Sequence, residues 1–98
     1  MREVVWTSSA LDSLDKIYEY YSVKSEKAAA KIVSSILART KQLSKYPLSG
    51  SEEELLKKLK LGHRYLVQGN YKIIFRVTKN AVLITDVFDT RMNPLRMI

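Results

Sequence analysis

Residues 64–77 read RYLVQGNYKIIFRV, and this stretch decides the fold. Two runs rich in β-branched and aromatic residues flank Gly69-Asn70, a residue pair that favours a tight turn between antiparallel strands. If the turn has two residues, Leu66 lies opposite Ile73 and points to the same side of the sheet. The sequence therefore predicts a β-hairpin over this stretch.

The two faces of the predicted hairpin differ in character. One face should meet the helices and carries Leu66, Tyr71, Ile73, Phe75 and Val77. The open face is basic and aromatic and carries His63, Tyr65, Lys72, Ile74 and Arg76. A one-residue change in turn length would place Arg64 on the open face in place of His63 and Tyr65. Lys72 and Arg76 stay there in either register.

Two further segments should extend this sheet. Residues 81–88, AVLITDVF, follow a turn at Lys79-Asn80 and are apolar enough for a mostly buried strand. Residues 2–6, REVVW, form a short β-branched and aromatic run. We therefore expect a mostly antiparallel sheet of four strands.

Two helices are predicted between the first strand and the hairpin. Residues 9–12, SALD, match a capping-box-like helix start, and apolar residues then recur at steps of three and four as far as position 21. A second helix should run from Ser25 to about Tyr46, where Pro47 and Gly50 end it. Joined by a tight turn, the two helices form an antiparallel hairpin.

The order of elements indicates an α+β fold. The predicted order is β-α-α-β-β-β, with the helical hairpin packed on one face of a four-stranded sheet. Residues 52–60 fit either a short helix or an ordered loop. A length of 98 residues suits one domain over residues 1–98.

The net charge of +7 belongs entirely to the C-terminal part of the chain. Residues 1–56 hold eight Lys/Arg and eight Asp/Glu, whereas residues 57–98 hold nine Lys/Arg against Asp86 and Asp89. A basic field of this kind attracts an anionic partner, either nucleic acid or an acidic protein segment. A solvated lysine-rich surface is the alternative interpretation.

Several function classes find no support. The absence of cysteine rules out disulfides and thiolate metal sites, and no apolar stretch has the length of a membrane span, so we expect a cytoplasmic protein without membrane contact. No phosphate-binding glycine loop or G-x-S-x-G motif is present. Asp86 and Asp89 have odd spacing and should point to opposite sides of a strand, which argues against a metal nuclease. We expect no cofactor and no metal.

The open face has the groups for RNA cleavage without metal, in which a 2′-hydroxyl attacks the neighbouring phosphate. Lys72 and Arg91 could stabilise the developing charge, His63 could titrate near neutral pH, and Tyr65 could hydrogen-bond a reacting group. These four are the candidate catalytic residues. The candidate nucleic-acid-binding residues are Arg64, Lys72, Arg76 and Arg91. More ordinary roles remain open, because a lone histidine often caps a strand and a tyrosine often packs.

Four segments, taken in order, resemble the RelE/ParE toxin superfamily: residues 5–7 (VWT), 46–50 (YPLSG), 69–76 (GNYKIIFR) and 86–94 (DVFDTRMNP). The resemblance implies the toxin of a type II toxin–antitoxin pair, bound by a cognate antitoxin in a hetero-oligomer. RelE-like members cleave messenger RNA in the ribosomal A site, whereas ParE-like members inhibit DNA gyrase.

This sequence matches the RelE-like catalytic set in part. Lys72 falls where those proteins place a sheet arginine, and Arg91 falls at the basic position after their last strand. His63 and Tyr65 stand where they carry lysines, and Met97 replaces a C-terminal aromatic residue. The preferred expectation is an RNA endonuclease acting on ribosome-bound messenger RNA. The alternatives are a non-enzymatic gyrase inhibitor that uses the helical hairpin and the C-terminal end, and an inactive member that binds its antitoxin.

Overall fold

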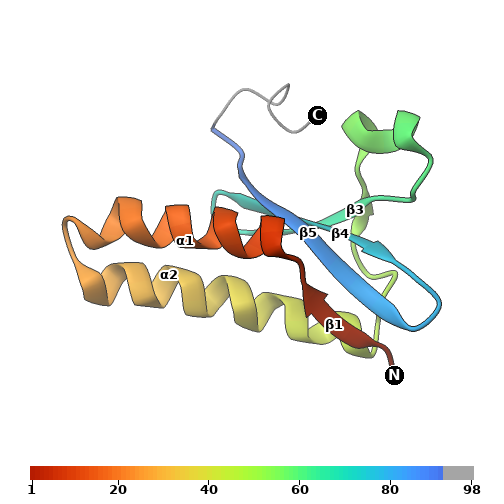
Figure 1. The fold of residues 1–98 in the computed structure, drawn as a ribbon, viewed down its shortest axis with the longest axis horizontal. Helices are drawn as coiled ribbons and strands as arrows, with labels where there is room; N and C mark the ends of the chain where they lie inside the picture. The colour runs from red at the N-terminus through yellow and green to blue at the C-terminus, as the bar shows by residue number, and fades with distance from the viewer. Residues whose placement is uncertain (92–98) are drawn as a thin grey trace.

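The computed structural model describes residues 1–91, and the expectations for Pro94 and Met97 lie outside the described residues. In chain order the elements are β1 (Glu3–Trp6), α1 (Ser8–Ser22), α2 (Glu26–Arg39), the 3-10 helix η1 (Thr40–Ser44), β2 (Ser51–Glu52), the 3-10 helix η2 (Glu54–Leu59), β3 (Arg64–Gln68), β4 (Tyr71–Val77) and β5 (Ala81–Asp89). Figure 1 shows the helical hairpin of α1 and α2 beside the sheet. The predicted α+β class is confirmed.

The sheet has five strands in the order β1-β5-β4-β3-β2 rather than the predicted four. β1 pairs in parallel with β5, and the other pairs are antiparallel. The additional strand, β2, has only two residues, Ser51 and Glu52, which pair with Tyr65 and Arg64. A strand this short has no alternation to detect, so its pairing partner alone defines it.

The predicted register of the central hairpin is confirmed. Leu66 pairs with Ile73 and Gln68 with Tyr71 around a two-residue turn in which Gly69 has a φ of 58°. A positive φ strongly favours glycine, so the turn chemistry fixes the register. The apolar face of the hairpin therefore meets the helices as expected.

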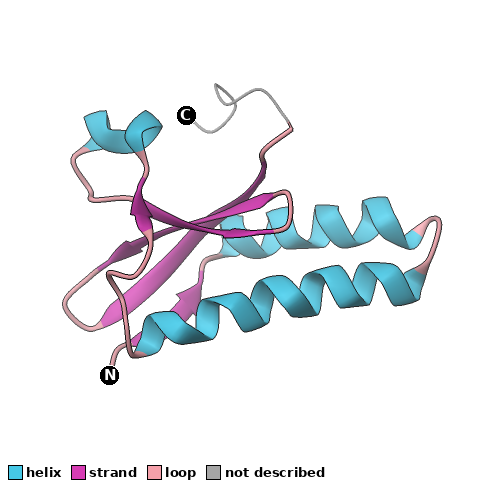
Figure 2. Ribbon diagram, turned by 180° about the vertical axis from the view of Figure 1, so that it is seen from behind, coloured by secondary structure: helices cyan, strands magenta, loops and turns pink. Residues whose placement is uncertain are grey.

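The main core lies between this face and the helical hairpin, and Figure 2 shows these two layers from behind. Its fully buried side chains include Phe75, Ile36, Leu43, Ile73 and Ile84. Gly50 lies at the rim of this core, where an added Cβ would stand 2.6 Å from the carbonyl oxygen of Tyr65 and 2.7 Å from the Phe75 ring. The chain can pass this point only because residue 50 has no side chain.

The helix boundaries differ from the predicted ones at two points. The N-cap of α1 is Thr7, whose hydroxyl accepts from the Ala10 amide at 3.2 Å, and Ser9 lies inside the helix. The α-helical part of the second helix ends at Arg39 instead of near Tyr46. The buried Thr40 hydroxyl donates to the Leu37 carbonyl at 2.8 Å, and the chain tightens there into 3-10 geometry, which is common at helix ends.

One free edge of the sheet is tied to the helical hairpin. The Arg39 Nε–H donates to the carbonyl oxygen of Val67 at 3.2 Å, beyond the point where the short β2 stops covering β3.

Within residues 1–91, no helix combines the length and apolar character needed to cross a membrane.

Candidate functional site

The open face of the sheet is covered in part by η2. Figure 1 shows η2 on the side of the sheet away from the helical hairpin. Leu56 of η2 is 6% exposed, and two sheet residues that alternate away from the main core, Ile74 and Phe88, are also buried. The residues around η2 therefore form a second, smaller apolar layer over the face that was expected to be open.

Lys72 lies beneath this cover and is already paired. Its ammonium donates to Glu53 Oε2 at 2.8 Å and stands 4.2 Å from the centroid of the Tyr65 ring. The Glu53 side chain is 3% exposed and that of Lys72 is 24% exposed, so the ion pair is largely removed from water. The structure brings together Lys72 and Tyr65, as predicted, but around a carboxylate that the sequence did not single out.

His63 borders the same cover. Its backbone carbonyl accepts from the Glu53 amide at 2.9 Å, and its Nδ1 atom is buried with no hydrogen-bond partner within the described part of the chain. Burial and then the positive charge of Arg76 lower the pKa of His63, whereas the negative charge of Glu53 raises it. Burial therefore favours the neutral imidazole, and Arg76 lies within its electrostatic reach.

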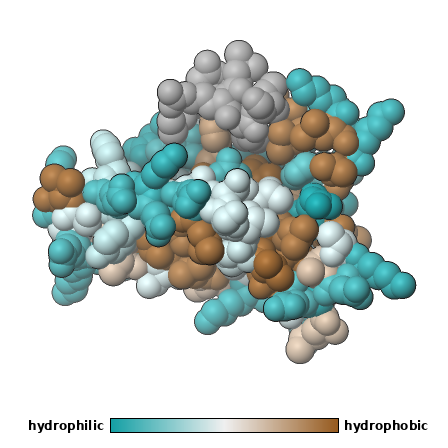
Figure 3. Space-filling view, viewed as in Figure 1, coloured by the Kyte–Doolittle hydropathy of each residue, from teal (hydrophilic) through white to brown (hydrophobic). Residues whose placement is uncertain are grey.

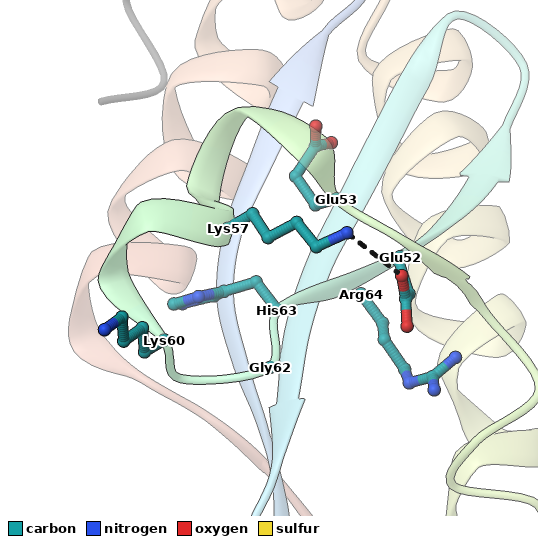
Figure 4. A pocket seen from close by; sticks show the side chains of 7 residues that line it. All are labelled: Glu52, Glu53, Lys57, Lys60, Gly62, His63 and Arg64. Carbon is teal, nitrogen blue, oxygen red and sulfur yellow. Dashed lines mark ion pairs between the residues drawn. The ribbon is translucent and has the colours of Figure 1, made fainter.

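A hollow of about 330 Å³ lies between η2 and the start of β3 (Figure 4). Its lining residues are Glu52, Glu53, Lys57, Lys60, Gly62, His63 and Arg64. Arg64 turns aside to the main chain, because its Nη1 donates to the Gly50 carbonyl at 2.9 Å. Lys57 lies 4.0 Å from Glu52 and 3.7 Å from Glu54, all with mostly exposed side chains. Such exposed pairs contribute little to stability.

Arg91 takes part in a different cluster, at the end of β5. It donates from Nε and Nη2 to the two oxygens of Asp89 at 3.0 and 2.8 Å, and from Nη2 to the Tyr21 hydroxyl at 3.0 Å. Hydrogen bonding to Tyr71 and then to Arg91 lowers the pKa of Tyr21, and burial raises that of Tyr71. The guanidinium thus joins the sheet to α1 instead of joining the group around Lys72.

The structure therefore divides the predicted site into parts. Lys72, Tyr65 and His63 surround Glu53, while Arg91 belongs to the Tyr21 cluster. Glu53 stands in a run of three glutamates, and nothing local distinguishes the buried member from its neighbours. Tyr21 could be found only as one member of the apolar stripe of α1.

Comparisons with known proteins identify the family. The model of the ParE toxin of the type II toxin–antitoxin system parDE matches residues 4–94. A solved structure described as the chromosomal ParDE toxin–antitoxin system from P. aeruginosa is 26% identical, with a TM-score of 0.77 over 91% of this chain and 96% of that chain. No curated protein matches the sequence. Because the family model spans almost the whole length, the chain belongs to the ParE toxin family, within the RelE/ParE superfamily, and is the toxin of a type II pair whose partner is an antitoxin.

Proposed function

We propose that this toxin acts in the cytoplasm by binding DNA gyrase, without catalysing a reaction of its own. The observation that carries the proposal is the ion pair between Lys72 and Glu53, whose carboxylate is 3% exposed. A nuclease that works by charge stabilisation needs cations free to meet the phosphate. Here the best-placed cation of the sheet face is neutralised by the protein itself.

The other candidate catalytic groups support the same choice. The Arg91 guanidinium is held by both oxygens of Asp89, and Nδ1 of the His63 ring is buried. A general acid or base must bring a ring nitrogen within hydrogen-bond reach of the reacting group, and this buried atom has no partner within residues 1–91. Inhibition by protein contact requires none of these groups to be free.

The helical hairpin supplies a surface suited to protein contact. Its turn end projects beyond the sheet in Figures 1 and 2, and exposed apolar surface is visible there in Figure 3. Tyr20 is 75% exposed and Val23 is 87% exposed, with Tyr18 nearby on the same helix at 37%. Tyrosine is enriched among the residues that dominate protein interfaces. We assign gyrase contact to this end of the hairpin.

Two assays run side by side on purified protein test the proposal: gyrase-driven DNA supercoiling and ribosome-dependent messenger RNA cleavage. We expect inhibition of supercoiling and no cleavage. The variant Tyr20→Ser/Val23→Ser should lose inhibition, whereas the control Leu59→Ser/Leu61→Ser, which removes apolar side chains that are each 50% exposed, should keep it. Cleavage by the wild type with unaffected supercoiling would overturn the proposal.

RNA cleavage remains the second candidate, because all the excess positive charge follows residue 56. In that case Lys72→Ala combined with Arg91→Ala abolishes growth inhibition while folding and antitoxin binding persist. If gyrase is the target, the same variant still inhibits growth. Adding Glu53→Gln to the wild type and to this double variant separates loss of the Lys72 cation from the destabilisation caused by an unpaired buried carboxylate.

A further inference from the structure

We infer that two copies of this chain associate through the outer face of the helical hairpin, so that α1 and α2 of both copies form a four-helix bundle. The outer face is the side of the hairpin turned away from the sheet, and Leu11, Tyr18 and Leu37 lie along its middle. The inference does not depend on gyrase binding, which we place on Tyr20 and Val23 at the turn end.

Two hydrogen bonds to the sheet show which flanks of the helices face each other. Ser13 of α1 donates to Asp86 of β5 at 2.6 Å, and Arg39 of α2 donates to the Val67 carbonyl of β3 at 3.2 Å. Since β5 and β3 lie on either side of β4, these two donors mark the two outer flanks of the hairpin. The opposite flank of each helix therefore faces the other helix.

An exposed apolar seam runs between these facing flanks. Successive residues of a helix turn by about 100°, so Leu11 lies opposite Ser13 on α1, and Leu37 lies opposite Arg39 on α2. Tyr18 follows Leu11 two turns later on the same flank. The exposed fractions of Leu11, Tyr18 and Leu37 are 45%, 37% and 38%. Figure 3 shows apolar surface between the two helices, as this seam requires.

The seam residues stand side by side in pairs. Leu11 lies eleven residues before the last residue of α1, and Leu37 lies eleven residues after the first residue of α2. In an antiparallel hairpin these two positions are level with each other. By the same count Tyr18 is level with Ala30, which is also exposed. The seam therefore has one layer of two leucines and one layer of a large and a small side chain.

The two helices border this seam with opposite charges. α1 presents three acids, Asp12, Asp15 and Glu19, and α2 presents Lys27 and Lys31, all of them exposed. None of these five side chains takes part in the ion pairs found within residues 1–91. Residues 1–56 have no net charge, because the excess positive charge follows them, so this face does not repel a second copy.

The charges favour a second copy in one particular orientation. A twofold axis along the seam places α1 of each copy on α2 of the other, so that acids meet lysines in both halves of the interface. Glu19 is level with position 29 of α2, and it would stand between Lys27 and Lys31 of the other copy. A twofold axis across the helices would instead place α1 on α1, acid against acid. The face is thus complementary to itself.

The same orientation buries the apolar seam. Leu11 of each copy meets Leu37 of the other, and Tyr18 meets Ala30, so that a large side chain packs against a small one. Layers of this kind form the core of antiparallel four-helix bundles. A partly exposed seam with charged borders also has the arrangement of a protein interface, in which an apolar centre lies within a polar rim.

Sedimentation equilibrium of the purified full chain, free of antitoxin, tests the association. We expect a dimer with a dissociation constant in the micromolar range. Leu37→Glu should be monomeric, because the twofold axis brings two new carboxylates into the apolar layer. The control Leu48→Glu, at a leucine that is 64% exposed outside the hairpin, should dimerise like the wild type. Circular dichroism verifies that each variant is folded.

A charge exchange tests the orientation. Glu19→Lys and Lys31→Glu each place like charges against each other twice in the dimer, so each should weaken association at least tenfold. An equimolar mixture of the two variants should recover the wild-type affinity, because every charge then meets its opposite in the mixed dimer. Glu54→Lys, which makes the same charge change as Glu19→Lys at an exposed site on η2, should dimerise normally.

Three results would overturn the inference. The first is a wild type that stays monomeric at about 200 µM. The second is a mixture of Glu19→Lys and Lys31→Glu that associates no better than either variant alone. The third is a monomeric wild type whose binding to the cognate antitoxin is lost in Leu37→Glu, which would assign the outer face to the antitoxin. Supercoiling inhibition is measured separately and bears only on the gyrase proposal.

Discussion

Two ion pairs of the same length stand in opposite surroundings. The Lys72–Glu53 and Arg91–Asp89 pairs both close at 2.8 Å, but the side chains are 24% and 3% exposed in the first and 56% and 21% in the second. Water screens the second pair and not the first. The buried pair therefore helps to hold the start of η2 against β4, whereas the exposed pair orients the end of β5 toward α1.

Breaking the buried pair should have the largest effect. Lys72→Met leaves the Glu53 carboxylate buried without a partner, which should destabilise the fold by about 3–5 kcal/mol. Urea unfolding at pH 7 measures the change, with Lys58→Met on the exposed side of η2 as the control. Glu53→Gln/Lys72→Met should recover most of the loss, since no charge is then buried. A double variant as unstable as Lys72→Met would show that the pair is not the cause.

Gly50→Ala should come next, because it overpacks the rim of the core directly before β2. The added Cβ would stand 2.6–2.7 Å from the Tyr65 carbonyl and the Phe75 ring, and overpacking of this kind costs about 1–3 kcal/mol. Thermal unfolding compares it with Ser51→Ala, at an exposed neighbouring position. An unchanged unfolding midpoint for Gly50→Ala would show that the protein accommodates the added Cβ without strain.

The pH dependence of stability should differ between the two regions. Burial and then Arg76 lower the pKa of His63 from its usual 6.5, so the unfolded chain binds more protons at this site. The stability from neutral His63 is complete above 6.5 and decreases as the pH falls below it toward the lower pKa of the folded state. The hydrogen bond to Arg91 lowers the pKa of Asp89 from its usual 3.8, so the stability from that pair is lost only as the pH falls further. His63→Gln should flatten the unfolding profile just below pH 6.5, and it should leave unchanged the loss of stability that Asp89 causes at more acid pH.

Arg91→Gln should have the smallest effect on stability, because the guanidinium is exposed. The effect of this substitution should still be measurable at Tyr21. The pKa of Tyr21 is lowered first by hydrogen bonding to Tyr71 and second by Arg91, so the variant should raise it toward the usual value. Ultraviolet titration of tyrosine, compared with Tyr21→Phe to assign the transition, measures this shift. A loss of stability as large as that of Lys72→Met would contradict the comparison between the pairs.

The sequence predicted the parts of this molecule that local chemistry determines. The Gly69-Asn70 turn specifies the hairpin register, and the register places Lys72 and Arg76 on one face. For residues 52–60 the sequence left a short helix and an ordered loop open, and the structure has the short 3-10 helix η2. Its position over the sheet could not be predicted, because 3-10 geometry gives no amphipathic period over six residues. The role of Glu53 depends on a partner 19 residues away. Arg91 was expected beside the open face, and only the position of Tyr21 at the end of α1 shows why its guanidinium lies elsewhere.

The contact between Arg39 and the carbonyl of Val67 bears on how this molecule behaves among copies of itself. An unpaired strand edge offers a template on which another chain can extend the sheet, and proteins protect such edges with very short strands and with charged side chains. This edge has both, a two-residue β2 and an arginine that occupies one of the outward carbonyls. The result is a sheet that resists edge-to-edge aggregation at the point where its hydrogen-bonding ladder would otherwise be open.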